Sequence, residues 1–487
     1  MTPSDSAGEN RVFAAIAVAF VVLAVRCVWR TWNILPISAP YQFDYEEGNI
    51  LNAFTLILKG ATPWPNPRAL PSFMNPYGPV AYYLLVLPVK LFGFALVYPR
   101  AMIVGLVLLV AAFIGVELKR ITRSTVLAVA FGLIYLTIPN VQEWGWLLRV
   151  DFLGIALTFA GLMVFERRIE GARKGIGGPI VLPALLFAAA LLVKTTLVAA
   201  PAACFFVLLT RRRFRDAALL FGLTAAGVVV VMGTFAVITR GAILTDVYLA
   251  HPDPYEKWRY LRGLARVVRE CWPLLLLAGI AAADDLARRR LSTPVAWFLV
   301  ATAMTFTAGA QGSSSNHFLE WNTTLCLTGG LGMARLLQLR LSTLRLAATA
   351  AVAAALALGL WPRREFNRLG AQAGCGSAYD WVRTQAPPNL LSENTGAVVL
   401  GGKKLWLSNP FAFAQMVEHR GWSDAELVRM IRESRFDAII VRDRNLEKKY
   451  RRFPPNALRA IAEAYEPGPG FQCHDMAAIF TPKKIPR

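Results

Sequence analysis

Three carboxylates, Asp44, Glu46 and Glu47, follow closely after the first long hydrophobic run of the chain, residues 12–28. Ionisable groups next to such a segment are costly to keep there and usually serve a function. In a membrane-embedded transferase, one carboxylate could deprotonate an acceptor hydroxyl or amine, and burial would tune its pKa towards the working pH. The alternative is a solvated loop acid or a helix N-cap ahead of the apolar stretch 50–58. Function is favoured for Asp44 and Glu47, and the structural alternative for Glu46.

A second group of charged residues stands at the ends of later hydrophobic segments. Arg149 and Asp151 lie two residues apart beside a pair of tryptophans. This pattern fits an interfacial anchor as well as a site in which Arg149 binds a lipid phosphate and Asp151 positions the acceptor. Lys194 lies at a break between two short hydrophobic segments and needs an anionic partner there. That partner is either a phosphate or, in a structural ion pair, Asp151 or Glu47, and the sequence leaves both alternatives open.

The segment 311–320 brings further polar residues to the start of another hydrophobic segment. His317 and Glu320 are three residues apart, on one face of a helix, and Asn316 precedes them. Two such ligands make only a weak metal signal, so a hydrogen-bonded pair lining a polar pocket is favoured. The sequence contains no Walker-type glycine loop and no GxSxG motif. A soluble nucleoside triphosphate is therefore disfavoured as a donor.

The whole chain is very hydrophobic and very basic. Of its 487 residues 55% are hydrophobic, and the formal net charge is +21. A soluble protein rarely combines these properties, whereas a polytopic membrane protein does, because its cytoplasmic loops collect Lys and Arg. Membrane topology and anionic lipid explain the charge. Nucleic acid is disfavoured as a partner, since no basic and aromatic binding module stands out.

Hydropathy and charge together predict about eleven transmembrane helices and a cytoplasmic N-terminus. The apolar stretch 77–94 is interrupted by Pro88 and Lys90, and we interpret it as a juxtamembrane or re-entrant helix within a first outer loop of residues 30–98. This choice places every basic cluster between the spans on the cytoplasmic side. The expected spans are residues 12–29, 101–116, 124–140, 150–165, 179–193, 195–210, 217–238, 272–283, 294–310, 317–337 and 345–361.

From residue 362 the composition becomes mixed and polar, which predicts a small extracytoplasmic α/β domain over residues 362–487, after a membrane domain of residues 1–361. Strands are expected at 389–393, 397–400, 404–407 and 437–441, and helices at 410–419 and 423–434. Cys375 and Cys473 both fall in this domain and could form a disulfide if it is extracytoplasmic. The fold class is thus a polytopic α-helical membrane protein with a small C-terminal α/β domain.

Several short motifs, taken in order, resemble those of a known family. The run 43–48 is followed by Asn75-Pro76-Tyr77-Gly78-Pro79, then by Arg149-Val150-Asp151, Lys194 and the run 316–320. This order resembles the GT-C membrane glycosyltransferases, in particular the bacterial branch akin to lipid A aminoarabinose transferases and protein O-mannosyltransferases. Many relatives have a double proline where this chain has Asn75 to Pro79.

The resemblance implies a hexosyl- or pentosyltransferase with a polyprenyl-phosphate-linked sugar donor and an inverting transfer to a glycan, lipid or protein acceptor. It implies no required cofactor, with a divalent cation left open. Asp44 matches the catalytic acid of the first outer loop, and Glu47 the second acid of that motif. The other expected site residues are Asp151 with the catalytic acids, Lys194 and Arg149 at the donor phosphate, and Tyr77, Asn316, His317 and Glu320 lining the pocket.

Two other functions are weighed against this one. An oligosaccharide ligase with a diphosphate-linked donor predicts a large outer loop late in the chain, whereas here the acid-rich loop comes first. A transporter or flippase of lipid-linked sugars predicts repeated halves with matching interrupted helices, and the break at Lys194 stands alone in the sequence. The favoured location is the bacterial inner membrane, with the C-terminal domain in the periplasm.

Overall fold

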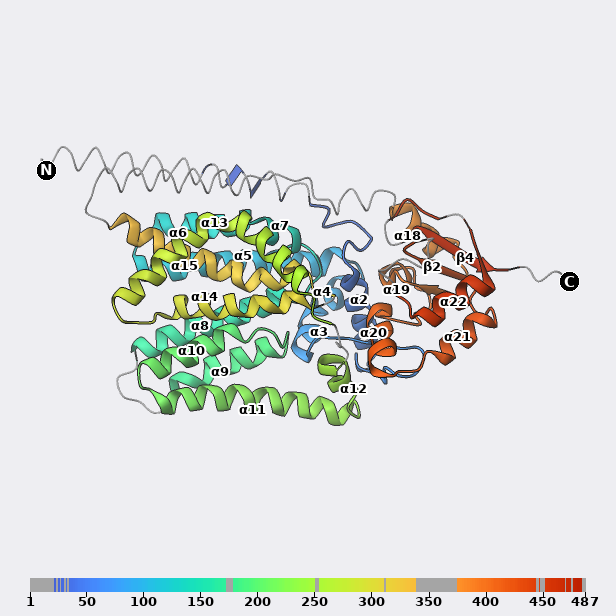
Figure 1. The fold of residues 1–487 in the computed structure, drawn as a ribbon, viewed down its shortest axis with the longest axis horizontal. Helices are drawn as coiled ribbons and strands as arrows, with labels where there is room; N and C mark the ends of the chain where they lie inside the picture. The colour runs from blue at the N-terminus through green and yellow to red at the C-terminus, as the bar shows by residue number, and fades with distance from the viewer. Residues whose placement is uncertain are drawn as a thin grey trace, which may run out of the picture.

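The computed structural model describes residues 35–171, 178–249, 254–310, 312–338, 375–443, 452–468, 470–473 and 476–483, with residue 446 and isolated positions between 22 and 32. A bundle of long helices forms one end of the molecule, and a smaller α/β domain forms the other (Figure 1). Short helices of the first outer loop lie where the two parts meet. This division follows the change of composition along the chain.

Nine helices of the bundle cover the expected spans from 101–116 to 317–337. Their hydrophobic residues pack into one large core, in which aromatic side chains such as Trp297 and Phe159 are fully buried. The structure confirms the predicted break near Lys194: one helix ends at Leu191 and the next begins at Ala199. The helices are α5 (Val97–Thr122), α6 (Thr125–Thr137), α8 (Asp151–Gly171), α9 (Gly178–Leu191), α10 (Ala199–Thr210), α11 (Phe214–Ile238), α13 (Lys257–Ala287), α14 (Thr293–Met304) and α15 (Leu319–Leu337).

Two of the described helices, α5 and α11, are long and apolar enough to cross a membrane by themselves. Apolar side chains on α11 point away from the protein, and Val237 is 81% exposed. Such a surface suits contact with lipid rather than water. The number of eleven spans stays a prediction, and the expected spans 12–29 and 345–361 fall mostly or wholly outside the described residues.

The first outer loop contains three short helices between the bundle and the α/β domain (Figure 1). They are α2 (Tyr45–Leu58), α3 (Pro79–Leu85) and α4 (Leu87–Phe92). Helices α3 and α4 lie within residues 77–94, the stretch predicted as a juxtamembrane or re-entrant helix. The stretch from Pro79 to Phe92 is about 21 Å long at 1.5 Å per residue, shorter than the hydrocarbon core of a bilayer.

The C-terminal domain has a four-stranded sheet in the order β1-β2-β4-β3. Strands β1 (Leu390–Ser392) and β2 (Ala438–Val441) are parallel, while β4 (Ala478–Pro482) is antiparallel to both β2 and β3 (Tyr465–Pro467). Helices α18 (Cys375–Thr384), α19 (Thr395–Leu400), α20 (Pro410–Arg420), α21 (Ala425–Arg432) and α22 (Pro455–Ala464) accompany it. A disulfide joins Cys375 to Cys473. The domain boundary at residue 361 lies outside the described residues and stays a prediction.

Two of the expected strands are wrong. Residues 397–400 belong to α19, because the Asn394 side chain accepts the backbone N–H of Ala397 and so caps a helix at this point. Residues 404–407 form only one isolated bridge, from Leu407 to Ser72 of the first outer loop. The apolar run was too short for periodicity to separate the two states.

The first outer loop is attached to the C-terminal domain by several contacts. Gly48 of α2 lies against the backbone of Gly396, and a Cβ at position 48 would come within 2.8 Å of the Gly396 Cα. The Tyr45 hydroxyl donates to Asn409 Oδ1 at 3.1 Å. Helix α2 is therefore held between the bundle and the C-terminal domain.

Candidate active site

Asp44 caps the start of α2. Its Oδ1 accepts the backbone N–H of Glu46 at 3.2 Å, while Glu47 accepts the backbone N–H of Asp44 and completes a capping box. The same Oδ1 accepts a hydrogen bond from Arg149 Nη1 at 2.8 Å. Asp44 is thus an N-cap and half of an ion pair at once. Its side chain is 15% exposed and lines the cavity described below.

Glu47 points into the protein instead. Its Oε1 and Oε2 accept hydrogen bonds from Arg100 Nε and Nη2, both at 2.8 Å, and neither side chain is exposed to solvent. The backbone N–H groups of Phe43 and Leu148 also donate to this carboxylate. Glu47 does not line the cavity. Glu47 is therefore bound to Arg100 outside the cavity, and its expected role as the second acid of the motif stays a prediction.

Asp151, at the first turn of α8, receives two side-chain hydrogen bonds and one further ion-pair contact. Lys194 Nζ lies 2.6 Å from its Oδ1, Asn316 Nδ2 lies 3.1 Å from the same oxygen, and Arg149 Nε lies 3.6 Å from Oδ2. Of the partners considered for Lys194, the structure shows Asp151. Asp151 is buried behind its donors and does not itself line the cavity.

Arg149 and Lys194 face a cavity of about 510 Å³ where the bundle, the first outer loop and the C-terminal domain meet. Arg149 also lies over the ring of Trp144, with its Cζ 5.3 Å from the ring centroid. The wall combines residues of the first outer loop, the break after α9, the segment between α14 and α15, and α20. The lining residues used below are Asp44, Glu46, Tyr77, Arg149, Lys194 and Asn409.

Glu46, expected to be a bystander, also lines this cavity. Its Oε2 accepts a hydrogen bond from Asn49 Nδ2 at 3.2 Å. Burial raises the pKa of the Glu46 carboxyl, and the positive charge of Arg149 opposes this only in part. Two carboxylates, Asp44 and Glu46, therefore face the cavity instead of the expected Asp44 and Glu47.

The remaining expected lining residues divide into two groups. Tyr77, Asn316 and His317 line the cavity, whereas Glu320 does not. His317 Nδ1 lies 3.1 Å from Thr307 Oγ1, and Glu320 accepts a hydrogen bond from Trp297 Nε1 at 2.8 Å. The predicted His317–Glu320 pair is wrong. Each of the two side chains has a partner on another segment instead, Thr307 for His317 and Trp297 for Glu320.

Sequence reasoning missed Arg100 entirely. This residue lies in the first turn of α5, just after Pro99, at the end of the span predicted to face outwards. A cation inside an apolar segment at that end runs against the positive-inside pattern, and that departure was the available signal. The contribution of Asn409 and Phe411, from the distant α20, left no signal in local sequence.

The described part of the chain offers no cluster for a bound metal. No group of three or more His, Cys, Asp or Glu side chains that could hold an ion occurs among these residues. The expectation that no cofactor is required, with a divalent cation left open, stays a prediction.

The sequence matches no family model and no curated protein. Solved structures do match. ArnT from Cupriavidus metallidurans bound to undecaprenyl phosphate has a TM-score of 0.63 and 13% sequence identity, over 96% of this chain and 99% of that one. Its apo state also has a TM-score of 0.63 and 13% identity, over 95% and 97%. The Archaeoglobus fulgidus oligosaccharyltransferase tethered with an acceptor peptide has a TM-score of 0.53 and 13% identity, over 93% and 72%. The matches to ArnT extend over the bundle and the C-terminal domain together.

Proposed function

We propose that this chain, which has the fold of the GT-C superfamily, is an integral membrane glycosyltransferase that moves a sugar from a polyprenyl-phosphate-linked donor to an extracytoplasmic acceptor. The observation that carries the proposal is the cavity into which two carboxylates and two cations converge. These four residues come from three separate parts of the chain and line the same cavity; they are Asp44, Glu46, Arg149 and Lys194. The structure of ArnT with undecaprenyl phosphate supports the class of donor.

Arg149 and Lys194 are the proposed ligands of the donor phosphate. Both are held by acids in this structure, Arg149 by Asp44 at 2.8 Å and Lys194 by Asp151 at 2.6 Å. A phosphate entering the cavity offers oxygens of the kind that guanidinium and ammonium groups bind strongly. When Arg149 turns to the phosphate, the Asp44 carboxylate is released towards the acceptor.

The proposed reaction is a single displacement at the anomeric carbon. The acceptor oxygen or nitrogen attacks from the face opposite to the phosphate, and its proton passes to the carboxylate of Asp44. The bond between the anomeric carbon and the phosphate oxygen breaks, and polyprenyl phosphate leaves with the electron pair, next to Arg149 and Lys194. The configuration of the sugar is inverted. Glu46, in the same wall, is the second carboxylate within the cavity.

The proposed orientation puts the cavity and the C-terminal domain outside the cytoplasm of a bacterial cell, at the inner membrane. The disulfide between Cys375 and Cys473 supports this orientation, because disulfides persist in oxidising compartments. Residues of α20 close one side of the cavity. We therefore assign the C-terminal domain a part in acceptor access.

The proposal is tested with purified protein in vesicles, supplied with a radiolabelled polyprenyl-phosphate sugar and membrane extract as the acceptor source. Asp44→Asn keeps an N-cap, since Asn caps helices as well as Asp, and it should lower transfer by about 10²–10⁴-fold with unchanged expression. Asp216→Asn is the matched control, because among the described residues Asp216 pairs with Arg213 alone, near the start of α11. Transfer by Asp44→Asn at the wild-type rate would remove Asp44 from the mechanism. Movement of the lipid across the vesicle membrane without any transfer would instead identify a transporter.

A further inference from the structure

A second and larger cavity, of about 650 Å³, lies at the other end of the helix bundle. Helix α8 connects the two regions, since Asp151 is at its first turn and Glu166 lines the second cavity. At 1.5 Å per residue these two positions are about 22 Å apart along the helix. The second cavity is therefore separate from the candidate active site, and no step of the proposed reaction uses it.

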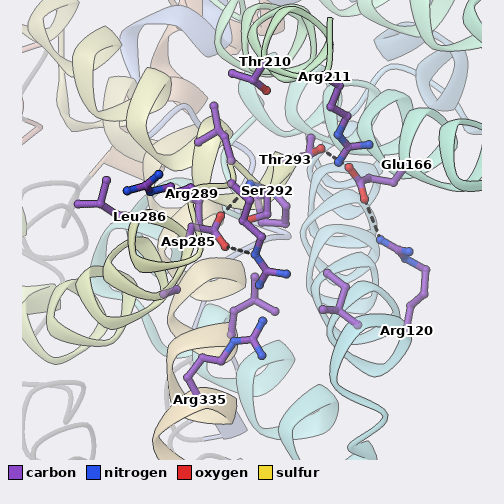
Figure 2. A pocket seen from close by; sticks show the side chains of 17 residues that line it. Arg120, Glu166, Thr210, Arg211, Asp285, Leu286, Arg289, Ser292, Thr293 and Arg335 are labelled. Atoms are coloured by element: carbon purple, nitrogen blue, oxygen red, sulfur yellow. Dashed lines mark hydrogen bonds and ion pairs between the residues drawn. The ribbon is translucent and has the colours of Figure 1, made fainter. Parts of the chain in front are cut away.

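Five arginines line this cavity. In Figure 2, Arg211, Arg120 and Arg335 approach the cavity from different helices and from different sides. The other two arginines are Arg289 and Arg290, in the turn between α13 and α14. Such a concentration of guanidinium groups repels itself unless anions are present.

The two carboxylates of the lining are already occupied. Glu166 accepts hydrogen bonds from Arg120, at 3.1 Å, and from the Thr293 hydroxyl. Asp285 accepts the backbone N–H of Ser292 at 2.7 Å and pairs with Arg290 at 3.1 Å (Figure 2). These acids attach the turn before α14 to the neighbouring helices, so they shape the cavity and neutralise only part of its charge.

Arg211 and Arg289 form no ion pair with a described acid, although Arg211 lies close enough to Glu166 for its charge to act on that carboxylate. Among the residues that the structure describes, neither has a carboxylate oxygen within 4.0 Å of its guanidinium group. Arg335, by contrast, is paired with Asp284 at 3.1 Å. Two guanidinium groups thus line a preformed cavity with their hydrogen-bond donors unused by protein anions.

The other walls of the cavity are apolar. Ile121, Leu291, Val295 and Leu331 line it, and Leu286, also part of the lining, is 79% exposed. A free inorganic anion gains nothing from these walls. An amphiphile gains from both parts, because its acyl chains cover the apolar side chains while its headgroup meets the arginines.

We propose that this cavity is a binding site for the phosphate-bearing headgroup of an anionic lipid, with Arg211 and Arg289 as its principal ligands. On the predicted topology this end of the bundle faces the cytoplasm, where anionic lipid attracts basic residues at the membrane surface. Guanidinium groups suit the ligand, because they bind phosphate oxygens through two parallel hydrogen bonds.

The experiment measures lipid binding to the full-length protein by native mass spectrometry from detergent. Phosphatidylglycerol is compared with phosphatidylcholine of the same acyl chains, and equilibrium dialysis with radiolabelled inorganic phosphate forms a separate arm. The test variant is Arg211→Ala/Arg289→Ala. Its matched control is Arg212→Ala/Arg288→Ala, which removes the same charge from the same two turns at positions outside the lining. Each pair also contains one residue with positive φ, Arg289 at 49° and Arg212 at 56°, so backbone effects are matched.

We expect the wild type and the control to bind phosphatidylglycerol at least tenfold more tightly than phosphatidylcholine, and the test variant to lose about tenfold of the affinity for phosphatidylglycerol. If the alanine variant is not monodisperse, Arg211→Lys/Arg289→Lys replaces it, and a several-fold loss is expected because Lys lacks the planar fork. Equal losses in test and control variants would overturn the site. Saturable phosphate binding that depends on Arg211 and Arg289, without preference between the lipids, would assign the site to free phosphate and overturn the lipid. No transfer reaction is measured, so these outcomes do not depend on the proposed function.

Discussion

Replacing Glu47 by Gln separates a positioning role from a catalytic one. Glu47 and Arg100 are both fully buried, and the carboxylate accepts two hydrogen bonds of 2.8 Å from the guanidinium group. Gln keeps the shape of the side chain but leaves the charge of Arg100 buried without its partner. Removing one member of a buried ion pair costs roughly 3–5 kcal/mol. The loss of stability is smaller here than for an isolated pair, because the Arg100 guanidinium also donates to the backbone carbonyls of residues 37, 39 and 41.

We expect the midpoint of thermal unfolding of Glu47→Gln, measured by tryptophan fluorescence in detergent, to fall by roughly 3–5 °C, because a chain of 487 residues shifts by about 1 °C per kcal/mol. Glu117→Gln is the matched control. Glu117 is equally buried, but its partner Arg120 is 23% exposed and keeps Glu166, so the loss should be clearly smaller. The double variant Glu47→Gln/Arg100→Leu should recover part of the loss, because no unpaired charge is left. A Glu47→Gln protein that unfolds like the wild type but transfers no sugar would refute this reasoning and return Glu47 to the catalytic residues.

Three further predictions concern the surroundings of the cavity. Gly48→Ala should loosen the contact between α2 and α19, because the added Cβ meets the backbone of Gly396. The measurement is the rate of amide hydrogen exchange in α19, which should be faster in Gly48→Ala than in Gly105→Ala. The latter is the control, because Gly105 has open space around it. Because burial raises the folded-state pKa of Glu46, the unfolded chain loses this proton first, and the free energy of unfolding should fall as pH rises from about 4.5 through the folded-state pKa. Glu46→Gln should remove this component of the pH profile, and identical profiles for both proteins would contradict the assignment. Lys194→Met should raise the KM for the donor about tenfold with a smaller change in kcat, measured by initial rates, whereas an effect on kcat alone would exclude Lys194 as a ground-state phosphate ligand.

The helices of the bundle could be predicted because long apolar runs and basic clusters are physically strong and local signals. The break at Lys194 is an example, since hydropathy alone placed two short helices around a single cation. The grouping of Arg149, Asp151 and Lys194 followed from topology, which put the ends of their helices on one side. Their pairing could not be predicted, because each cation had both a phosphate and a protein acid as acceptable partners.

The errors arose where the deciding contact is distant in sequence. Glu46 and Glu47 are adjacent acids of the same helical turn, and contacts with Arg100 and Leu148, both distant in sequence, hold Glu47 away from the cavity. Residues 397–400 have an apolar, β-branched composition that suits a strand, yet the side chain of Asn394 caps a helix there. The predicted pairing of His317 with Glu320 failed because each side chain has a partner outside its own turn, Thr307 and Trp297 respectively.

The position of Asp44 depends on both parts of the protein. On one side, the first turn of α2, which Asp44 caps, is attached to the bundle through Glu47 and Arg100. On the other side, the hydroxyl of Tyr45 and the backbone of Gly48 contact the C-terminal domain. A shift of the C-terminal domain against the bundle therefore acts directly on the turn that carries Asp44. Since Asn409 of the C-terminal domain also lines the cavity, the same shift changes the room for the acceptor and the direction of the carboxylate together.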